Sequence, residues 1–136
     1  MKIIKFTIIA ISIFIYRCLG YEPIVKLNII DNSFNRHNVL SFMNQIGIKE
    51  IPTVEKIMML ETSHLTSNLY KTNHNLFGLR TTKYLKFNDW KESILCYKKW
   101  QDKYYKGNLY NALDSHWLGK KSNYSRVLKY VQINIY

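Results

Sequence analysis

Apolar residues recur every three or four positions in several stretches of this chain, which is the spacing of one face of an α-helix. The first stretch follows the polar segment 31–33, a typical helix start, and ends near Gly47, which suits a left-handed helix end. We therefore predict a helix over residues 34–46, after a short extended leader over residues 21–30. Its apolar face carries Val39, Phe42, Met43 and Ile46.

A second apolar stripe runs along residues 53–64 and includes the acid Glu61. Pro52 suits the start of this helix, and Glu61 lies at helical spacing from the apolar residues Val54, Ile57, Met58 and Leu65. Glu61 therefore belongs to the apolar face, in the last turn. A carboxyl group in such a setting loses hydration, which disfavours its charged form and suits a general acid. The same position also lets an acid reach water or cap a loop amide, so the stripe alone leaves both interpretations open.

The middle of the chain carries a different pattern. Residues 66–74 are polar and few, which is typical of a loop at the edge of a cleft. Residues 76–87, interrupted around 80–83, are the best candidate for a small β-hairpin, and Gly78 marks a position where side-chain bulk is excluded. This segment is the only predicted β structure.

Three further helices are predicted downstream. Asn88 or Asp89 can cap a long helix that Gly107 ends, with Asp89 and Glu92 at the spacing of a capping box. One side of this helix carries Trp90, Ile94, Tyr97, Trp100 and Tyr104. Two shorter helices follow over residues 109–117 and 122–131, and the second of them points Tyr124, Val127, Leu128 and Val131 inward. Five helices around one hairpin make an α+β fold that is mostly α.

Three separated motifs occur in a fixed order along this framework. They are Glu61-Thr62-Ser63-His64, then Asn75-Leu76-Phe77-Gly78, then the aromatic and polar run over residues 87–94. Together they resemble the glucosaminidase domain of bacteria and phages, the mannosyl-glycoprotein endo-β-N-acetylglucosaminidase-like domains grouped as glycoside hydrolase family 73. The resemblance covers roughly Val54 to Val131. It implies a lysozyme-like fold, with the small hairpin beside the active-site cleft and Glu61 as the catalytic proton donor.

The resemblance also implies residues that bind the substrate. Asn75, Phe77 and Gly78 match the segment that borders the cleft opposite the acid, where Asn75 can orient the loop or a substrate amide and Phe77 packs beneath. His74 replaces an Asn that the family often has, which puts a sugar contact at this position in doubt. Tyr124 matches the late tyrosine of the family, whose hydroxyl faces the cleft. The alternative for Tyr124 is a core tyrosine at the start of the last helix.

A glycosidase also needs a second group that stabilises the oxocarbenium ion or activates water. The downstream carboxylates are those of Asp89, Glu92, Asp102 and Asp114. Asp89 and Glu92 have the alternative role of capping a helix, and Asp102 stands beside lysines on a solvated face. The pattern leaves the second catalytic group unassigned, with Asp89 as the candidate and assistance by the N-acetyl group of the substrate as the alternative.

The first residues of the chain predict export. A basic start, an apolar run from Phe6 to Tyr16 and the small residues near Gly20 are typical of a signal peptide over residues 1–20, with an uncleaved anchor as the alternative. The single catalytic domain then covers residues 21–136. Cleavage removes Lys2, Lys5 and Arg17 but no acid, which lowers the net charge from +11 to +8. Such a surface favours polyanions, including the anionic polymers of a cell wall.

Cysteine and histidine content argue against disulfides and metals. Cleavage leaves Cys96 as the only cysteine, which fits a small core residue. The four histidines His37, His64, His74 and His116 match no metal-binding spacing, and no phosphate-binding glycine loop is present. We expect neither a metal nor a cofactor.

These features predict an exported, monomeric peptidoglycan hydrolase. It would cleave the β-1,4 bond between N-acetylglucosamine and N-acetylmuramic acid, with a peptidoglycan glycan strand as its partner and no nucleic acid. Lysozyme or lytic transglycosylase activity on the neighbouring bond is the nearest alternative, because the fold and a lone helix-end acid serve all three chemistries. An inactive cationic module that binds the cell wall is the alternative from another class of protein.

Overall fold

The computed structural model describes residues 33–118 and 122–136. The chain divides into two compact units, residues 1–32 and 33–136. The predicted signal peptide and the leader over residues 21–30 lie outside the described residues. Within the described ranges, none of the helices has the length and apolar character needed to span a bilayer.

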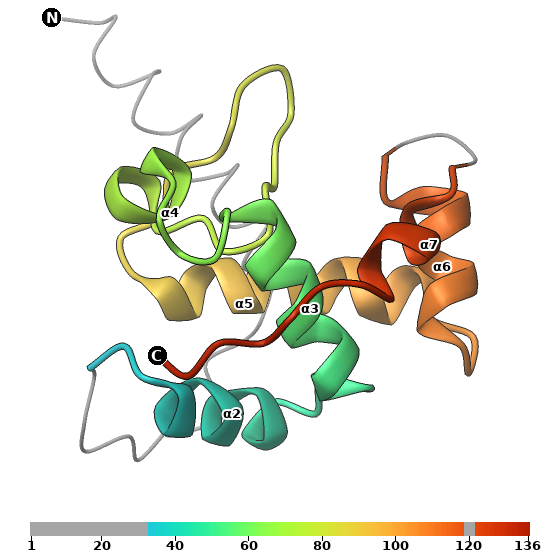
Figure 1. Cartoon of the computed structure of the whole chain (residues 1–136), viewed down its shortest axis with the longest axis horizontal. Coiled ribbons are helices and arrows are strands. Elements are labelled where there is room, and N and C mark those ends of the chain that lie inside the picture. Colours follow the sequence, from blue (N-terminus) through green and yellow to red (C-terminus); the bar gives the residue numbers. More distant parts are fainter. Residues whose placement is uncertain (1–32, 119–121) are drawn as a thin grey trace, which may run out of the picture. The chain divides into compact units, whose positions relative to one another are not determined.

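Helices α2 (Arg36–Gln45) and α3 (Ile51–Glu61) confirm the first two predicted helices. The side chain of Asn35 caps α2 by accepting a 2.9 Å hydrogen bond from the Asn38 backbone amide. Gly47 follows with φ of 76°, the left-handed turn that its lack of a side chain permits. Helix α3 crosses the middle of the unit, with α2 near its start and α7 near its end (Figure 1). It ends three residues earlier than predicted, at Glu61 itself.

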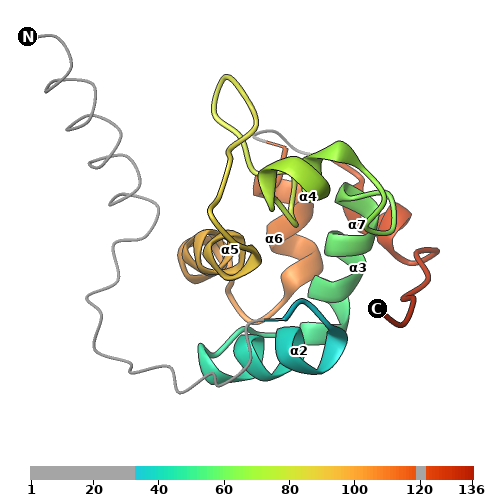
Figure 2. The same cartoon turned by 90° about the vertical axis from the view of Figure 1, so that its left-hand side faces the viewer.

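Helix α5 (Trp90–Tyr104) is the longest helix of the described chain. Asp89 and Glu92 cap its start: Asp89 accepts a 3.0 Å hydrogen bond from the Glu92 amide, and Glu92 accepts one of 2.9 Å from the amide of Asn88, one residue before the cap. Helix α6 (Leu109–His116) packs against α5, and Figure 2 shows these two helices next to each other. The predicted helices over 89–107 and 109–117 are therefore confirmed within one turn at their ends.

The last helix is shorter than predicted. Helix α7 (Tyr124–Leu128) stops three residues before the predicted end at residue 131. Tyr124 and Leu128 are buried as expected, but the prediction that Val127 points inward is wrong, since 52% of its surface is exposed. Helix α7 has only five residues and buries one narrow face, formed by Tyr124 and Leu128. Val127 lies outside this face and is exposed to solvent.

The prediction of a loop over residues 66–74 is wrong in part. Helix α4 (Asn68–Asn73) occupies most of it, capped by Ser67, whose hydroxyl accepts a 3.4 Å hydrogen bond from the Tyr70 amide. None of the α4 residues is buried, so the sequence carries no apolar stripe from which to recognise a helix of six residues.

Residues 76–87 form an irregular segment that follows α4. One isolated antiparallel bridge, between Arg80 and Tyr84, is the β pairing found among the described residues. The coarse prediction of a mostly helical fold is confirmed, because helices account for most of the ordered elements in these ranges.

The core is built from the apolar faces of α2, α3, α5, α6 and α7 together with the start of the 76–87 segment. Its largest fully buried side chains are Phe42, Met43, Ile57, Met58, Met59, Leu76, Phe77, Ile94, Tyr97, Leu109, Leu113 and Leu128. Phe77 stacks on Tyr97 with ring centroids 4.5 Å apart, which anchors the 76–87 segment to α5.

The end of the chain returns to the first two helices (Figure 1). The Arg36 amide donates a 2.9 Å hydrogen bond to the Tyr136 carbonyl, and the Tyr136 ring stacks on Phe34. Beneath them, the Arg36 guanidinium binds both carboxylate oxygens of the buried Glu55, at 2.9 and 3.0 Å. This two-point contact closes the unit and holds α2 against α3.

Candidate active site

Glu61 is the last residue of α3, and the chain turns away immediately after it. Thr62 is fully buried, and its hydroxyl donates a 2.6 Å hydrogen bond to the Met58 carbonyl. The same oxygen accepts a 3.0 Å bond from the Leu65 amide. Ser63, His64 and Leu65 all have φ values between 50° and 66°, in the left-handed region. Three such residues in succession cannot continue a helix, so Glu61 is left at its open end.

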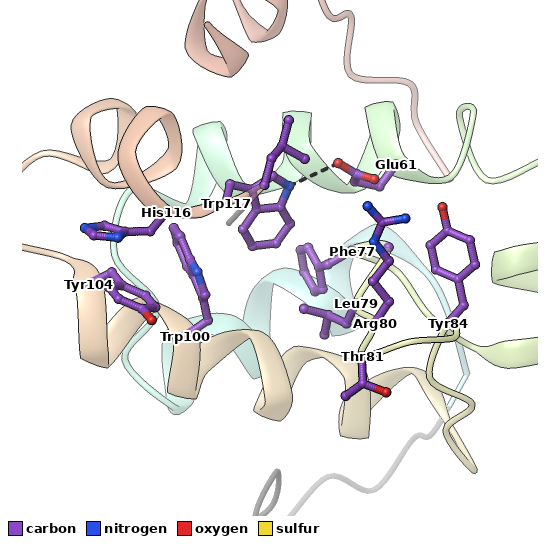
Figure 3. A pocket seen from close by; sticks show the side chains of 12 residues that line it. Glu61, Phe77, Leu79, Arg80, Thr81, Tyr84, Trp100, Tyr104, His116 and Trp117 are labelled. Carbon is purple, nitrogen blue, oxygen red and sulfur yellow. Dashed lines mark hydrogen bonds between the residues drawn. The ribbon is translucent and has the colours of Figure 1, made fainter. Parts of the chain in front are cut away.

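The Glu61 carboxylate is held by two donors from distant parts of the chain. The Tyr124 hydroxyl donates a 2.5 Å hydrogen bond to Oε1, and the Trp117 indole nitrogen donates one of 3.1 Å to the same atom. Figure 3 shows the Trp117 bond. Because both donors engage Oε1, Oε2 is the oxygen on which a neutral Glu61 can carry its proton.

Gly78 packs directly against the other carboxylate oxygen. A Cβ atom placed on Gly78 would lie 2.4 Å from Glu61 Oε2, and the residue has φ of +62°. Both the close approach and the left-handed backbone require glycine at this position. The predicted proximity of the Asn75–Gly78 motif to the acid is therefore present in the structure.

Tyr124 is a neutral hydrogen-bond donor in this arrangement. Burial raises the pKa of its hydroxyl well above the ordinary tyrosine range, and the charge of Glu61 and the hydrogen bond to it raise the pKa further. A phenol that keeps its proton at all physiological pH values always donates to Glu61. The hydroxyl thus orients the acid and does not compete with it for the proton.

Asp114 and Ser125 hold Tyr124 in place. Asp114 accepts a 2.8 Å hydrogen bond from the Ser125 amide and a 2.6 Å bond from the Ser125 hydroxyl. These bonds tie the start of α7 to α6, next to Tyr124. The role of Asp114, which the sequence left open, is to join these two helices.

A cavity of about 430 Å³ opens beside Glu61. It lies between the ends of α3, α5 and α6 and the segment 77–84 (Figure 3). This volume lies within the ~300–1,000 Å³ common for small-molecule sites. Its lining comprises Glu61, Phe77, Gly78, Leu79, Arg80, Thr81, Tyr84, Trp100, Tyr104, His116, Trp117 and Leu118. Aromatic rings dominate, which suits the apolar faces of sugar rings.

Glu61 supplies the one carboxylate among the residues that line this cavity. Asp89, the candidate for a second catalytic carboxylate, is exposed at the start of α5 and caps that helix. Glu92 completes the same cap, and Asp102 forms an exposed ion pair with Lys98. The carboxylate of Asp114 accepts hydrogen bonds from Ser125. The helix-capping interpretation of Asp89 is the one that the geometry supports.

Asn75 is fully buried, and its side-chain amide forms hydrogen bonds with backbone groups of the protein. Its Nδ2 donates to the carbonyls of Leu79 and Leu85, at 2.7 and 3.0 Å, and its Oδ1 accepts from the Leu79 amide at 2.9 Å. Asn75 therefore orients the loop, one of the two roles considered for it, and is not among the residues that line the cavity. Phe77 packs beneath the cavity, as expected.

Local patterns did not predict the contributions of Trp117, Arg80 and Trp100 to this site. Trp117 lies 56 residues from Glu61 in the sequence, so no helical or strand period connects them. Trp100 lies on the aromatic side of the predicted long helix, and the structure leaves it half-buried and places it in the lining of the cavity. Trp117 directly follows α6, and an aromatic residue at a helix end, close to a chain turn, is the one signal that could have identified it.

Histidines do not gather at this site. In residues 33–118 and 122–136, no group of three or more His, Cys, Asp or Glu side chains is arranged to hold a metal ion. His116 stacks on Tyr104 with ring centroids 4.3 Å apart, and a His74 ring nitrogen lies 3.1 Å from the Phe87 carbonyl.

The site consists of a single acid at a helix end, two fixed donors on one of its oxygens and an aromatic cavity. Comparison with known proteins adds no relative: no protein-family model, curated protein or solved structure matches this chain. The functional interpretation therefore depends on the residues and their geometry.

Proposed function

We propose that this protein is an exported peptidoglycan hydrolase, an endo-β-N-acetylglucosaminidase with Glu61 as its general acid. It would cleave the β-1,4 bond between N-acetylglucosamine and N-acetylmuramic acid. The observation that carries the proposal is the Glu61 carboxyl group, whose Oε1 is fixed by Trp117 and Tyr124 while Oε2 lies against Gly78 beside an aromatic cavity. A positioned acid beside a sugar-sized aromatic cavity suits glycosidic bond cleavage.

In the first step, Glu61 would give its Oε2 proton to the glycosidic oxygen as the bond from that oxygen to C1 breaks. Positive charge then develops on the sugar ring. Because no second carboxylate lines the cavity among the described residues, the carbonyl oxygen of the substrate's 2-acetamido group is the nucleophile that would close on C1. Water would then attack C1 and pass its proton to the Glu61 carboxylate, which restores the acid.

Lytic transglycosylase activity is the second candidate, and the same observation favours it. A single carboxylate can first protonate the leaving oxygen and then accept the proton of the C6 hydroxyl of N-acetylmuramic acid as that oxygen attacks C1. No water is consumed, and the product carries a 1,6-anhydro ring. Lytic transglycosylase and lysozyme both act on the neighbouring bond, at C1 of N-acetylmuramic acid. Lysozyme activity there would leave an ordinary reducing N-acetylmuramic acid end, so the product identifies the reaction.

We also propose a lysozyme-like fold for this chain. A lysozyme-like fold would place a helix-end acid across a cleft from a small hairpin. The position of Glu61 at the end of α3, and the Arg80–Tyr84 bridge at the edge of the cavity, support this arrangement. Export and a monomeric state are likewise proposed, from the basic and apolar start of the chain and the net charge of +8 after cleavage.

The test compares the full-length chain with Glu61→Gln, which keeps the size of the side chain and removes the transferable proton. Each protein is incubated with peptidoglycan, and the new ends are reduced with borohydride and identified by mass spectrometry. We expect reduced N-acetylglucosamine ends from the Glu61 protein and a loss of at least ~10²-fold in rate for the variant. Two control variants, Asp102→Asn and Asp89→Asn, should retain cleavage, because neither side chain lines the cavity.

Other outcomes would indicate a different activity or contradict the role of Glu61. Reduced N-acetylmuramic acid ends indicate a lysozyme, and 1,6-anhydro ends indicate a lytic transglycosylase. Cleavage that survives Glu61→Gln contradicts the assignment of the acid. Binding to peptidoglycan without cleavage by any variant contradicts an enzyme and supports a cell-wall-binding module.

A further inference from the structure

The two ends of the cavity differ in chemistry. At one end lie Trp100, Tyr104 and His116, with Tyr104 and His116 stacked nearly parallel, at an angle of 17°. Arg80 and Tyr84 lie at the other end, on the Glu61 side (Figure 3). An aromatic end favours the apolar face of a neutral sugar, whereas a guanidinium favours an anion. A glycan that spans the cavity would therefore meet two distinct environments.

Arg80 is positioned by its own segment. Its backbone pairs with that of Tyr84 in the antiparallel bridge, and its guanidinium carbon lies 5.8 Å from the centroid of the Tyr84 ring. A cation within about 6 Å of an aromatic face is attracted to it, so the ring supports the side chain beside the cavity. Tyr84 is itself 53% exposed, which leaves this end open to solvent and to a large ligand.

Arg80 forms no ion pair with an acid among the described residues. In the part of the chain that the structure describes, the ion pairs are Arg36 with Glu55 and Lys98 with Asp102, and neither involves Arg80. Arg80 is also the one cationic side chain among the residues that line the cavity. Its planar donors can bind a carboxylate at two points, a geometry that a lysine cannot reproduce.

We infer that Arg80 is a specificity residue that binds a carboxylate group carried by the glycan. This inference rests on the proposed function and names the substrate class of the same site. In peptidoglycan such a group is found on the muramyl unit, either as the free lactyl carboxylate after the peptide is removed or as a carboxylate of the stem peptide. The muramyl unit would occupy the Arg80 end, and the neutral N-acetylglucosamine unit would occupy the aromatic end.

The test measures binding by calorimetry, with the full-length Glu61→Gln protein so that the ligands are not cleaved. Four glycan fragments of equal length are compared: one with stem peptides, one with the peptides removed by an amidase, one with all carboxylates converted to methylamides, and a neutral chito-oligosaccharide. The fragments with stem peptides and with free lactyl groups distinguish the two sources of the carboxylate. Each is measured with and without the additional change Arg80→Gln.

The matched control is Lys83→Gln. Lys83 lies on the same segment, is exposed and does not line the cavity, and its replacement removes the same charge. We expect at least one carboxylated fragment to bind about tenfold more tightly than the neutral fragments, the effect of one charge-assisted contact at a partly open site. Arg80→Gln should abolish this ratio, and Lys83→Gln should preserve it.

The failure of this inference and that of the proposed function are distinguishable. Equal binding of carboxylated and neutral fragments, or an equal loss in both variants, overturns the role of Arg80 even if Glu61-dependent cleavage is observed. Carboxylate-dependent binding that requires Arg80, without any cleavage by the Glu61 protein, supports the inference for a binding module and overturns the enzyme.

Discussion

Gly78→Ala should lower the activity of this protein strongly while lowering its stability only slightly. The added Cβ would lie 2.4 Å from Glu61 Oε2, whereas ordinary contacts of a Cβ begin at 3.4 Å, so the carboxylate oxygen must move by about 1 Å. The atom that must yield is the end of a flexible side chain, so the fold can absorb this displacement. The cost in unfolding free energy is then mainly that of a left-handed alanine, about 1–2 kcal/mol.

Activity should respond much more strongly. Displacement of a reacting group by about 1 Å can cost about 10²-fold in rate, because the acid no longer meets the leaving oxygen at the correct distance and angle. The movement also disturbs the bonds from Trp117 and Tyr124 to Oε1. We therefore expect a fall of about 10²-fold in kcat on peptidoglycan.

The chain offers a matched control for this experiment. Gly47 also has a left-handed backbone, with φ of +76°, but a Cβ there has no neighbour within 4 Å. Gly47→Ala should lose a similar unfolding free energy in urea and keep full activity. If folded Gly78→Ala turns over peptidoglycan at a rate within about threefold of that of Gly47→Ala, the contact between Gly78 and Glu61 does not set the position of the acid.

Three further predictions follow from the buried polar groups. Tyr124→Phe removes the hydroxyl that orients Glu61 and should lower kcat by about tenfold while changing the unfolding free energy by only about 1 kcal/mol, measured by kinetics and urea titration; an unchanged kcat would argue against an orienting role. Asn75→Ala leaves loop amide and carbonyl groups without their buried partner and should cost about 2–3 kcal/mol in urea unfolding, whereas a purely substrate-binding Asn75 would leave stability unchanged. Burial raises the folded-state pKa of Tyr97, Tyr124 and Tyr136 above the unfolded value near 10, so their contribution to stability is complete below pH ~10 and should be lost as the pH rises further. Urea unfolding between pH 9 and pH 12, with tyrosinate absorbance recorded in parallel, checks this; early ionisation of all tyrosines in the folded protein would contradict it.

Local sequence patterns predicted most of the helical framework. Caps and breaks act over three or four residues, so Asp89 with Glu92 identified the start of α5 and Gly47 marked the turn after α2. The apolar stripe in α3 was also local, and it placed Glu61 on the correct face. Short elements were less predictable: α4 buries no residue and therefore has no apolar stripe.

The candidate site was predicted only in part. The order of motifs, through the family resemblance, pointed to Glu61, Gly78 and Tyr124, and these three residues lie together in the structure. The same approach offered Asp89 as a second carboxylate and considered a substrate contact for Asn75. The structure uses Asp89 to cap α5 and Asn75 to hold a loop, because a side chain whose hydrogen bonds are already made inside the protein is not available to a ligand.

By itself, the sequence determined where most helices begin and end and which acid occupies an apolar face, because these depend on neighbours within one or two turns. Only the tertiary structure decided which groups surround that acid. Trp117 and Tyr124 contact Glu61 although they lie 56 and 63 residues away in the sequence. Arg80 lines the cavity because it lies on a segment whose fold is held by the buried Asn75. Contacts between residues so far apart in the sequence depend on how whole helices pack. The periodicity of apolar residues along the chain does not predict that packing.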